Sequence, residues 1–190
     1  MTIVAATGNA HKLKEMREIL KGYTVLSAEE AGFFGEVEET GKDFLENAFL
    51  KARAVAKKTG KAALADDSGL CVKALGGAPG IYSARYSGGD SKENRILLLK
   101  NLEGITEREA CFVCAIALVC PDGTEYSSIG KTFGTILYEE RGTNGFGYDS
   151  LFLSTDLNKS FAEASDEEKN AVSHRGRALK GLLASLKEEA

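Results

Sequence analysis

The most constraining stretch of this 190-residue chain is residues 64–88, where a short apolar run gives way to two adjacent carboxylates. The apolar run 62–65 ends at Asp66 and Asp67, and a long glycine-rich segment follows. Carboxylates at the end of a buried strand, facing a glycine-rich loop, are typical of metal and phosphate sites in α/β sheets. The alternative is an Asx-type turn, in which an aspartate side chain bonds nearby backbone amides. The pattern alone leaves both interpretations open.

The N-terminal segment predicts a strand, a turn and a helix. Residues 3–6 form an apolar run typical of a buried strand, and apolar residues then recur at helical spacing at Leu13, Met16 and Leu20. The turn 7–9 therefore lies at a helix N-terminus, where amides without internal partners can bind an anion. Lys12 lies in the first turn of this helix, where the helix dipole disfavours a cation unless an anion offsets it. Lysine is also a common exposed residue, so Lys12 alone does not identify a site.

A second helix is predicted from about 41 to 58. Its apolar face consists of Phe44, Ala48, Ala52 and Val55. Thr40 to Asp43 has capping-box spacing, and Glu39 just before it can complement the helix dipole. Lys51 lies seven residues after Phe44 on the apolar face, so its ammonium either reaches solvent or meets an anion.

The rest of the chain predicts further scaffold. We expect a helix at 91–103 with Ile96, Leu99 and Leu102 facing inward, a strand pair at 110–120 and 124–138, and a strand at 151–153. Ser165 to Glu168 is a second capping box, and a final amphipathic helix carries Ala178, Leu179, Leu182, Leu183 and Leu186. Gly130-Lys131-Thr132 is not a P-loop, because the motif needs glycine at 125, where the chain has glutamate, and a following helix.

Composition limits the class of protein. The net charge of −4 argues against a nucleic-acid-coating surface, and no apolar run approaches the length of a membrane span. The N-terminus has no signal-peptide pattern. Cys111 and Cys114 lie three apart on an expected strand, so they point to opposite faces and cannot share a metal. We expect Cys111 and Cys114 to be buried, reduced thiols, which fits a cytoplasmic protein.

Five separated segments together resemble the inosine triphosphate pyrophosphatase family, whose members hydrolyse deaminated purine nucleoside triphosphates to the monophosphate and pyrophosphate. The first is Thr7-Gly8-Asn9-Ala10-His11-Lys12. The second and third are Ala65 to Leu70 and Gly76 to Tyr86. The fourth is Gly145-Phe146-Gly147-Tyr148-Asp149, and the fifth contains Lys169 and Ser173-His174-Arg175. The similarity extends from residue 3 to residue 183, with the region 90–140 contributing least.

The resemblance implies roles for these residues. Asp67 would be the general base for a water that attacks the α-phosphorus, and Glu39, Asp67 and Asp66 would bind Mg²⁺. The substrate-binding residues would be Thr7, Gly8, Asn9, Ala10, His11, Lys12, Lys51, Ser68, Phe146, Gly147, Tyr148, Asp149, Lys169, His174 and Arg175. Three acids close to a triphosphate would repel it without a cation. How Asp66 and Asp67 divide the work stays open, because successive side chains on a strand diverge.

The resemblance also implies an elongated mixed α/β sheet within one domain spanning 1–190, with two lobes and a nucleotide cleft between them, and a cytoplasmic homodimer. Selectivity would come from the six-position edge of hypoxanthine or xanthine, where N1–H donates and O6 accepts. Adenine reverses both groups and would leave buried partners unpaired. Two alternatives remain: a related pyrophosphatase for modified pyrimidine nucleotides, and a non-catalytic nucleotide-binding module.

Overall fold

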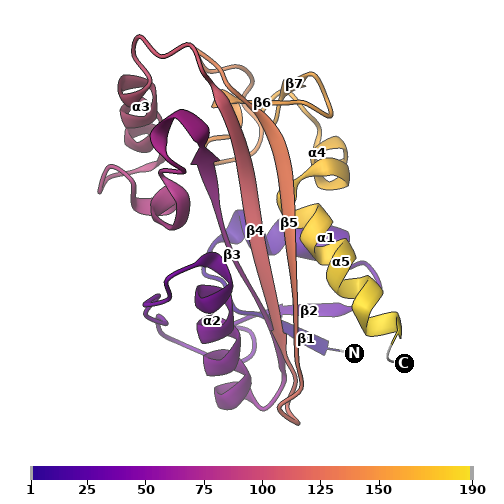
Figure 1. Ribbon diagram of the computed structural model, residues 1–190. Helices are drawn as coiled ribbons and strands as arrows, with labels where there is room; N and C mark the ends of the chain where they lie inside the picture. Colours follow the sequence, from indigo (N-terminus) through magenta and orange to yellow (C-terminus); the bar gives the residue numbers. More distant parts are fainter. Residues whose placement is uncertain (1, 189–190) are drawn as a thin grey trace. The chain divides into compact units, whose positions relative to one another are not determined.

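The computed structural model describes residues 2–188 and contains a mixed seven-stranded sheet with helices beside it (Figure 1). The strand order is β2-β1-β3-β4-β5-β6-β7. The strands are β1 (Thr2–Ala5), β2 (Thr24–Ser27), β3 (Ala62–Val72), β4 (Glu109–Val119), β5 (Glu125–Ile136), β6 (Phe152–Ser154) and β7 (Lys159–Ser160). The helices are α1 (Ala10–Ile19), α2 (Phe44–Thr59), α3 (Ser91–Asn101), α4 (Asp166–Val172) and α5 (His174–Glu188).

The directions of the strands make the sheet mixed. β1 runs parallel to both β2 and β3, whereas β6 is antiparallel to β5 and β7. A parallel neighbour needs a crossover connection, and α1 and α2 are in the segments that lead from β1 to β2 and from β2 to β3. The predicted mixed α/β fold is therefore confirmed.

The chain divides into two compact units, which are described separately. The first contains residues 1–67, 114–130 and 175–190, and the second contains 68–113 and 131–174. Strands β3, β4 and β5 each contribute residues to both units. The expected nucleotide cleft between two lobes stays a prediction.

In the first unit, alternate residues of each strand pack against different helices. Ile3, Ala5, Ala62 and Leu64 share one core cluster with residues of α1 and α5, such as Met16 and Leu179. Their neighbours Val4, Ala6, Ala63 and Ala65 belong to a second cluster with Ala48, Ala52 and Val55 of α2. This period of two is what a strand buried on both faces requires. Figure 1 shows α2 and α5 on either side of these strands.

The second unit has its own aromatic core. Phe112 of β4 packs against Phe152, with ring centroids 4.6 Å apart, and stacks against Phe161 at 6.1 Å. Helix α3 contributes Leu98, and Leu102 follows at its C-cap. The predicted inward position of Ile96 is wrong, because 56% of this residue is exposed. The buried face consists of Asn94, Leu98 and Leu102, which are spaced four apart, so Ile96 lies on the other side of the helix.

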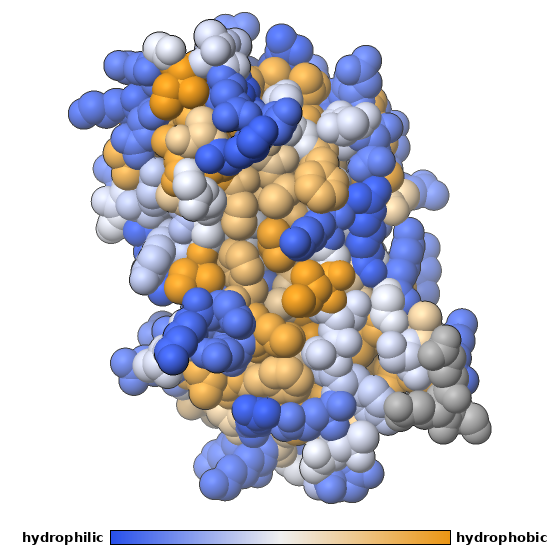
Figure 2. Space-filling view, in the orientation of Figure 1, coloured by the Kyte–Doolittle hydropathy of each residue, from blue (hydrophilic) through white to orange (hydrophobic). Residues whose placement is uncertain are grey.

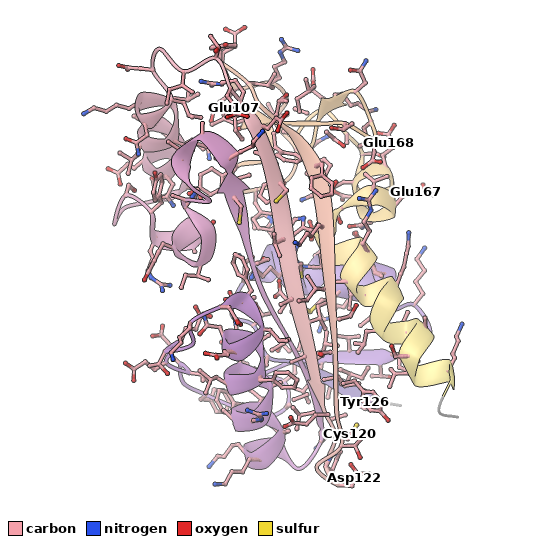
Figure 3. The ribbon with its side chains drawn as sticks, viewed as in Figure 1. Glu107, Cys120, Asp122, Tyr126, Glu167 and Glu168 are labelled. Carbon is pink, nitrogen blue, oxygen red and sulfur yellow. The ribbon has the colours of Figure 1, made fainter. Side chains whose placement is uncertain are left out.

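Two predicted boundaries also differ from the structure. The strand at 62–65 does not end at the aspartates but continues as β3 to Val72, so Asp66 and Asp67 lie mid-strand. Helix α2 begins at Phe44, with Asp43 as the N-cap whose Oδ1 accepts from the amide of Glu46. The Thr40–Asp43 spacing is therefore not the capping box. The Ser165 capping box is present, and Glu167 and Glu168 lie in the first turn of α4 (Figure 3).

The turn at Pro121 to Gly123 joins β4 to β5 as predicted, and Cys120, Asp122 and Tyr126 mark this end of the strand pair in Figure 3. All four cysteines are thiols. Cys114 is buried as predicted, whereas Cys111 is only half-buried.

Hydrophobic residues are not confined to the cores. Orange hydrophobic surface appears among the hydrophilic residues in Figure 2, and Phe34, Phe133 and Tyr138 are largely exposed. Within residues 2–188, no helix combines the length and the hydrophobicity that crossing a lipid bilayer demands.

Candidate active site

The turn between β1 and α1 is built as a helix N-terminus. The amide of Asn9 donates to Oγ1 of Thr7 at 3.1 Å, and Oδ1 of Asn9 accepts from the amides of His11 and Lys12 at 3.0 and 3.3 Å. Asn9 is thus the N-cap of α1. Two of the amides that were expected to face phosphate are bonded to Asn9 in this structure. A phosphate at the helix N-terminus would compete with the Asn9 side chain for them.

A cavity of about 710 Å³ opens beside this turn within the first unit. Residues 6–10 form one side, and Glu39 and Lys51 also line it. Phe33, Phe34, Glu36 and Val37 complete much of the remaining wall. The predicted phosphate turn and two of the predicted charged residues therefore face one space.

Asp66 points to the face of β3 that carries α1 and α5. Its Oδ2 accepts from Nη2 and Nε of Arg175 at 2.8 and 3.2 Å, and Nζ of Lys12 lies 3.2 Å from the same oxygen. Arg175 also forms an ion pair with Glu15 of α1. Burial would raise the pKa of Asp66, but the charges of Lys12 and Arg175 outweigh it and hold the pKa well below its usual range. Asp66 is therefore ionised inside a buried charge network.

Asp67 points to the opposite face, toward α2. Nδ2 of Asn47 donates to Oδ2 of Asp67 at 3.1 Å, and Nζ of Lys51 lies 3.7 Å from Oδ1. Burial raises the pKa of Asp67, the charge of Lys51 opposes that rise, and Glu39 adds to it. A buried carboxyl group with a raised pKa, beside the cavity-lining Lys51 and Glu39, suits proton transfer better than an ordinary surface aspartate.

Lys51 joins the two predicted acidic ligands of this face. Its Nζ donates to Oε1 of Glu39 at 2.7 Å. Burial would lower the pKa of Lys51, but the charges of Asp66, Asp67 and Glu39 raise it, so the ammonium keeps its proton. Lys51 therefore meets carboxylates of the same chain in this structure, and its expected contact with phosphate stays a prediction.

The acidic residues of the candidate site fit Mg²⁺ only as a pair of carboxylates that shares the ion with substrate phosphates and water. Among residues 2–188, no three acidic, histidine or cysteine side chains converge as a metal-binding group. Glu39 and Asp67 do converge on one cation, the Lys51 ammonium. Mg²⁺ is commonly bound by one or two carboxylates together with substrate phosphates and water, and this pair matches that mode. Asp66 fits this mode of Mg²⁺ binding less well, because its Oδ2 already contacts Arg175 and Lys12. Its Oδ1 is buried and has no hydrogen bond from the described residues.

The predicted base-binding residues of the second unit also lie together. Nζ of Lys169 donates to Oδ2 of Asp149 at 2.7 Å and lies 4.7 Å from the centre of the Phe146 ring. The backbone amide of Phe146 donates to the same Asp149 oxygen at 2.9 Å. Phe146 is half-buried, whereas Tyr148 is only 5% exposed. Tyr148, a predicted substrate-binding residue, is therefore buried, and its contact with a substrate stays a prediction.

The core explains the position of Tyr148. Its ring packs in the second unit's hydrophobic cluster, and its hydroxyl donates to the carbonyl of Ser83 at 2.7 Å. Ser83 in turn accepts from the amide of Leu70 at 2.9 Å through its hydroxyl. Tyr148 thus ties the 145–149 loop to the segment after β3, and only Phe146 is left to offer a ring to a base.

The C-terminal recognition residues are buried. His174 stacks on Phe112, with ring centroids 4.7 Å apart and an interplanar angle of 12°. Arg175 is 1% exposed and paired with Asp66 and Glu15. Ser68, the first residue of the second unit, is half-buried in β3. Direct contact of these three residues with a nucleotide stays a prediction.

Asn47 and Glu15 contact candidate-site residues but belong to none of the predicted motifs. Asn47 lies four residues before Lys51, and Glu15 lies three residues after Lys12, so each shares a helix face with a predicted site lysine. That helical spacing could have indicated that Asn47 and Glu15 lie near the site lysines. It could not show that the partners would be Asp67 and Arg175, because those contacts join distant segments.

The fold and the site define an α/β protein with carboxylate–lysine pairs near a helix N-terminus, a position where many proteins bind anions. Residues 3–185 match the model of the Ham1 family, and the chain belongs to that family. The predicted relationship is confirmed.

Individual relatives cover nearly the whole chain. A dITP/XTP pyrophosphatase from Geobacter sulfurreducens is 52% identical, covering 93% of this chain and 92% of its own. A dITP/XTP pyrophosphatase from Streptomyces avermitilis is 48% identical, and the match covers 98% of this chain and 97% of the relative. The solved structure of the Staphylococcus aureus Ham1 protein aligns over all of both chains, with a TM-score of 0.89 and 42% identity.

Proposed function

We propose that this protein is a Mg²⁺-dependent pyrophosphatase that converts ITP, dITP and XTP to the monophosphate and pyrophosphate, and so keeps deaminated purines out of DNA and RNA. The observation that carries the proposal is the cavity of the first unit, where the 6–10 turn, Lys51 and Glu39 face one space. The names of the relatives support the substrate class.

The charges in this cavity suit a triphosphate. Lys51 and the amides at the start of α1 supply positive potential, and Lys12 adds a second ammonium beside Asp66. Glu39 and Asp67 would hold Mg²⁺, which when bound offsets the repulsion between these carboxylates and the phosphates. The substrate would then displace Lys51 from its present carboxylate partners toward phosphate oxygens.

Asp67 is the proposed general base. Asn47 occupies Oδ2 of Asp67, which directs Oδ1 to the side of Lys51. Oδ1 would accept a proton as the water oxygen bonds to the α-phosphorus and the bond from that phosphorus to the bridging oxygen breaks. Pyrophosphate leaves with the bonding electrons. The raised pKa of Asp67 brings its proton affinity closer to what general base catalysis needs near neutral pH.

Base selection is proposed for the second unit. Phe146 offers the stacking surface, and the Lys169–Asp149 pair offers polar groups next to it. Hypoxanthine and xanthine present O6 as an acceptor and N1–H as a donor, which a lysine and a carboxylate can satisfy. Adenine would leave both groups unpaired, and such mismatches reach roughly 10⁴-fold in discrimination.

The direct test is pyrophosphate release from ITP, dITP and XTP, measured beside ATP, GTP and TTP with Mg²⁺ and with EDTA. We expect release from the first three only, and only with the metal. Preference for a modified pyrimidine triphosphate would favour the related pyrimidine activity, and binding without release would favour a non-catalytic module.

The proposed base has its own test. Asp67→Asn should bind ITP with little change while turnover falls by about 10³-fold, because a general base contributes on the order of 10² to 10⁴. Near-normal turnover in this variant would remove Asp67 from that role.

A homodimer in the cytoplasm remains part of the proposal, and sedimentation of the purified protein tests the dimer.

A further inference from the structure

The loop that carries Phe146 has little conformational preference of its own. Gly145 and Gly147 flank Phe146 and both adopt left-handed backbone angles, with φ of +71° and +60°. Glycine populates many backbone states, so the local chain does not fix the direction of the Phe146 ring. Hydrogen bonds of the loop must do so.

The first of these bonds holds the N-terminal side of Phe146. Its amide donates to Oδ2 of Asp149 at 2.9 Å, and Lys169 donates to the same oxygen at 2.7 Å. The amide of Asp149 donates back to the carbonyl of Phe146 at 3.1 Å, which closes a tight turn. This side of the loop uses residues that already belong to the candidate site.

The second contact comes from Arg95 of α3, which no motif indicated. Nη1 of Arg95 donates to the carbonyl of Gly147 at 2.9 Å and to the carbonyl of Ser91 at 3.1 Å. Its Nε forms an ion pair with Glu140, and Glu140 accepts from the hydroxyl of Ser150 at 3.2 Å. Only 20% of the Arg95 side chain is exposed. The guanidinium therefore joins α3 to the C-terminal side of Phe146.

A small cavity lies beside the hydrogen bond between Arg95 and the Gly147 carbonyl. It measures about 160 Å³ and is lined by residues 142–147 together with Arg95, Glu140, Asp149 and Ser150. Because this space lies against the loop, the peptide between Phe146 and Tyr148 has room to turn if the bond to the Gly147 carbonyl is lost.

We propose that Arg95 is a positioning residue for base recognition, acting through the Gly147 carbonyl to fix the Phe146 ring. The inference rests on the proposed function, since it assigns Phe146 the contact with the base. Arg95 itself touches no substrate in this scheme. Its loss should weaken recognition of the base and leave recognition of the phosphates unchanged.

The test compares Arg95→Leu, Arg95→Lys and Glu140→Gln in the full-length protein. For Arg95→Leu we expect the KM for ITP to rise about tenfold, the scale of one lost charge-assisted hydrogen bond, with kcat changed less than about threefold. Glu140→Gln keeps the Gly147 bond and should stay within about twofold of wild type. Arg95→Lys retains a donor and should recover part of the loss.

Two controls separate positioning from general damage. The inhibition constant of inorganic tripolyphosphate, which has phosphates but no base, should be unchanged in Arg95→Leu. Arg53→Leu makes the same substitution in another arginine–glutamate pair, where Arg53 binds Glu125 through two 2.7 Å contacts in the first unit. That variant should keep the wild-type KM.

Several results would overturn the inference. These are a wild-type KM in Arg95→Leu, an equal loss in Glu140→Gln, or a matching rise in the tripolyphosphate inhibition constant. Hydrogen exchange of residues 145–149 adds a readout that needs no substrate. Faster exchange in Arg95→Leu but not in Glu140→Gln supports the role of the Gly147 bond, and equal exchange contradicts it. Failure of the proposed function is distinct, because it shows in wild-type protein as no pyrophosphate release from ITP.

Discussion

Asn47 connects two segments of the candidate site that are distant in sequence. Its Nδ2 donates to Asp67 of β3, and its Oδ1 accepts from the amide of Gly41 at 2.8 Å, just after Glu39. A side chain at Gly41 would put its Cβ 2.6 Å from Oδ1 of Asn47 and 2.8 Å from the Asn47 backbone nitrogen. The approach of the Glu39 segment to α2 therefore requires glycine at position 41 for reasons of space.

Gly41→Ala should accordingly destabilise the protein by about 1–3 kcal/mol, the usual cost of overpacking, because the backbone of α2 cannot give way. Urea unfolding followed by circular dichroism measures the free energy of unfolding. Gly22→Ala is the matched control, since a Cβ there meets nothing within 4 Å. Its effect should stay within about 0.5 kcal/mol. Equal effects of the two substitutions would refute the close-approach argument.

Cys71 gives a prediction about pH. Burial, together with the neighbouring Cys111 thiol, raises the pKa of Cys71 to about 11. Because the thiolate is the reactive form, the alkylation rate of Cys71 by iodoacetamide should rise about tenfold per pH unit from pH 7 to 9 without levelling off. A thiol of ordinary pKa, near 8.5, would level off across this range. Mass spectrometry of the alkylated peptide gives the rate, and a plateau below pH 9 would contradict the prediction.

At the scale of elements, β3 is the organising strand of the first unit. Its even-numbered residues face α1 and α5 and its odd-numbered residues face α2, so the adjacent Asp66 and Asp67 enter different environments. Asp66 compensates the buried charges of Arg175 and Lys12. Asp67 instead has a raised pKa, so its ionised form is costly in the folded state at neutral pH.

Substituting each aspartate by asparagine should therefore affect the free energy of unfolding to different extents. Asp66→Asn leaves buried cations without their main partner and should cost about 3 kcal/mol. Asp67→Asn removes a costly charge and keeps an acceptor for Asn47, so the free energy of unfolding should change by less than about 1 kcal/mol. Denaturant unfolding of both variants at pH 7 measures this difference. A larger loss in Asp67→Asn would contradict the assignment of the two faces.

At the scale of the whole molecule, no linker separates the two compact units. The boundaries between them fall within β3, β4 and β5, so each of these strands belongs to both units. Domains that unfold independently are usually joined by exposed linkers with few contacts across them. Strands shared by both units should instead couple their unfolding.

We therefore expect a single unfolding transition. Cys120 belongs to the first unit and Cys71 to the second, so their reactivity toward a thiol reagent reports on each unit separately. The reaction rates of both thiols should rise above their values in the folded protein at the same urea concentration, coincident with the loss of secondary structure by circular dichroism. Two separated midpoints would show that the units unfold independently.

Much of the fold could be predicted from local patterns. The N-terminal strand–turn–helix, the 91–101 helix and the final amphipathic helix follow from periodicity, and the Ser165 capping box follows from four residues. Motif similarity indicated the family and grouped the Lys169, Asp149 and Phe146 side chains correctly. These features depend on residues close in sequence or on matches to a known pattern, which is why the sequence determines them.

The tertiary structure decided the rest. Periodicity predicted that β3 ends before Asp66, yet the strand continues, because Arg175 and Lys12 from distant helices compensate the buried carboxylate. The resemblance made Tyr148 a predicted substrate-binding residue, but the Ser83 carbonyl and the second unit's core hold its side chain inside. Asn47 and Arg95 had no motif at all. In each case the deciding partner is remote in sequence, so the energy that stabilises the arrangement exists only once the chain has folded.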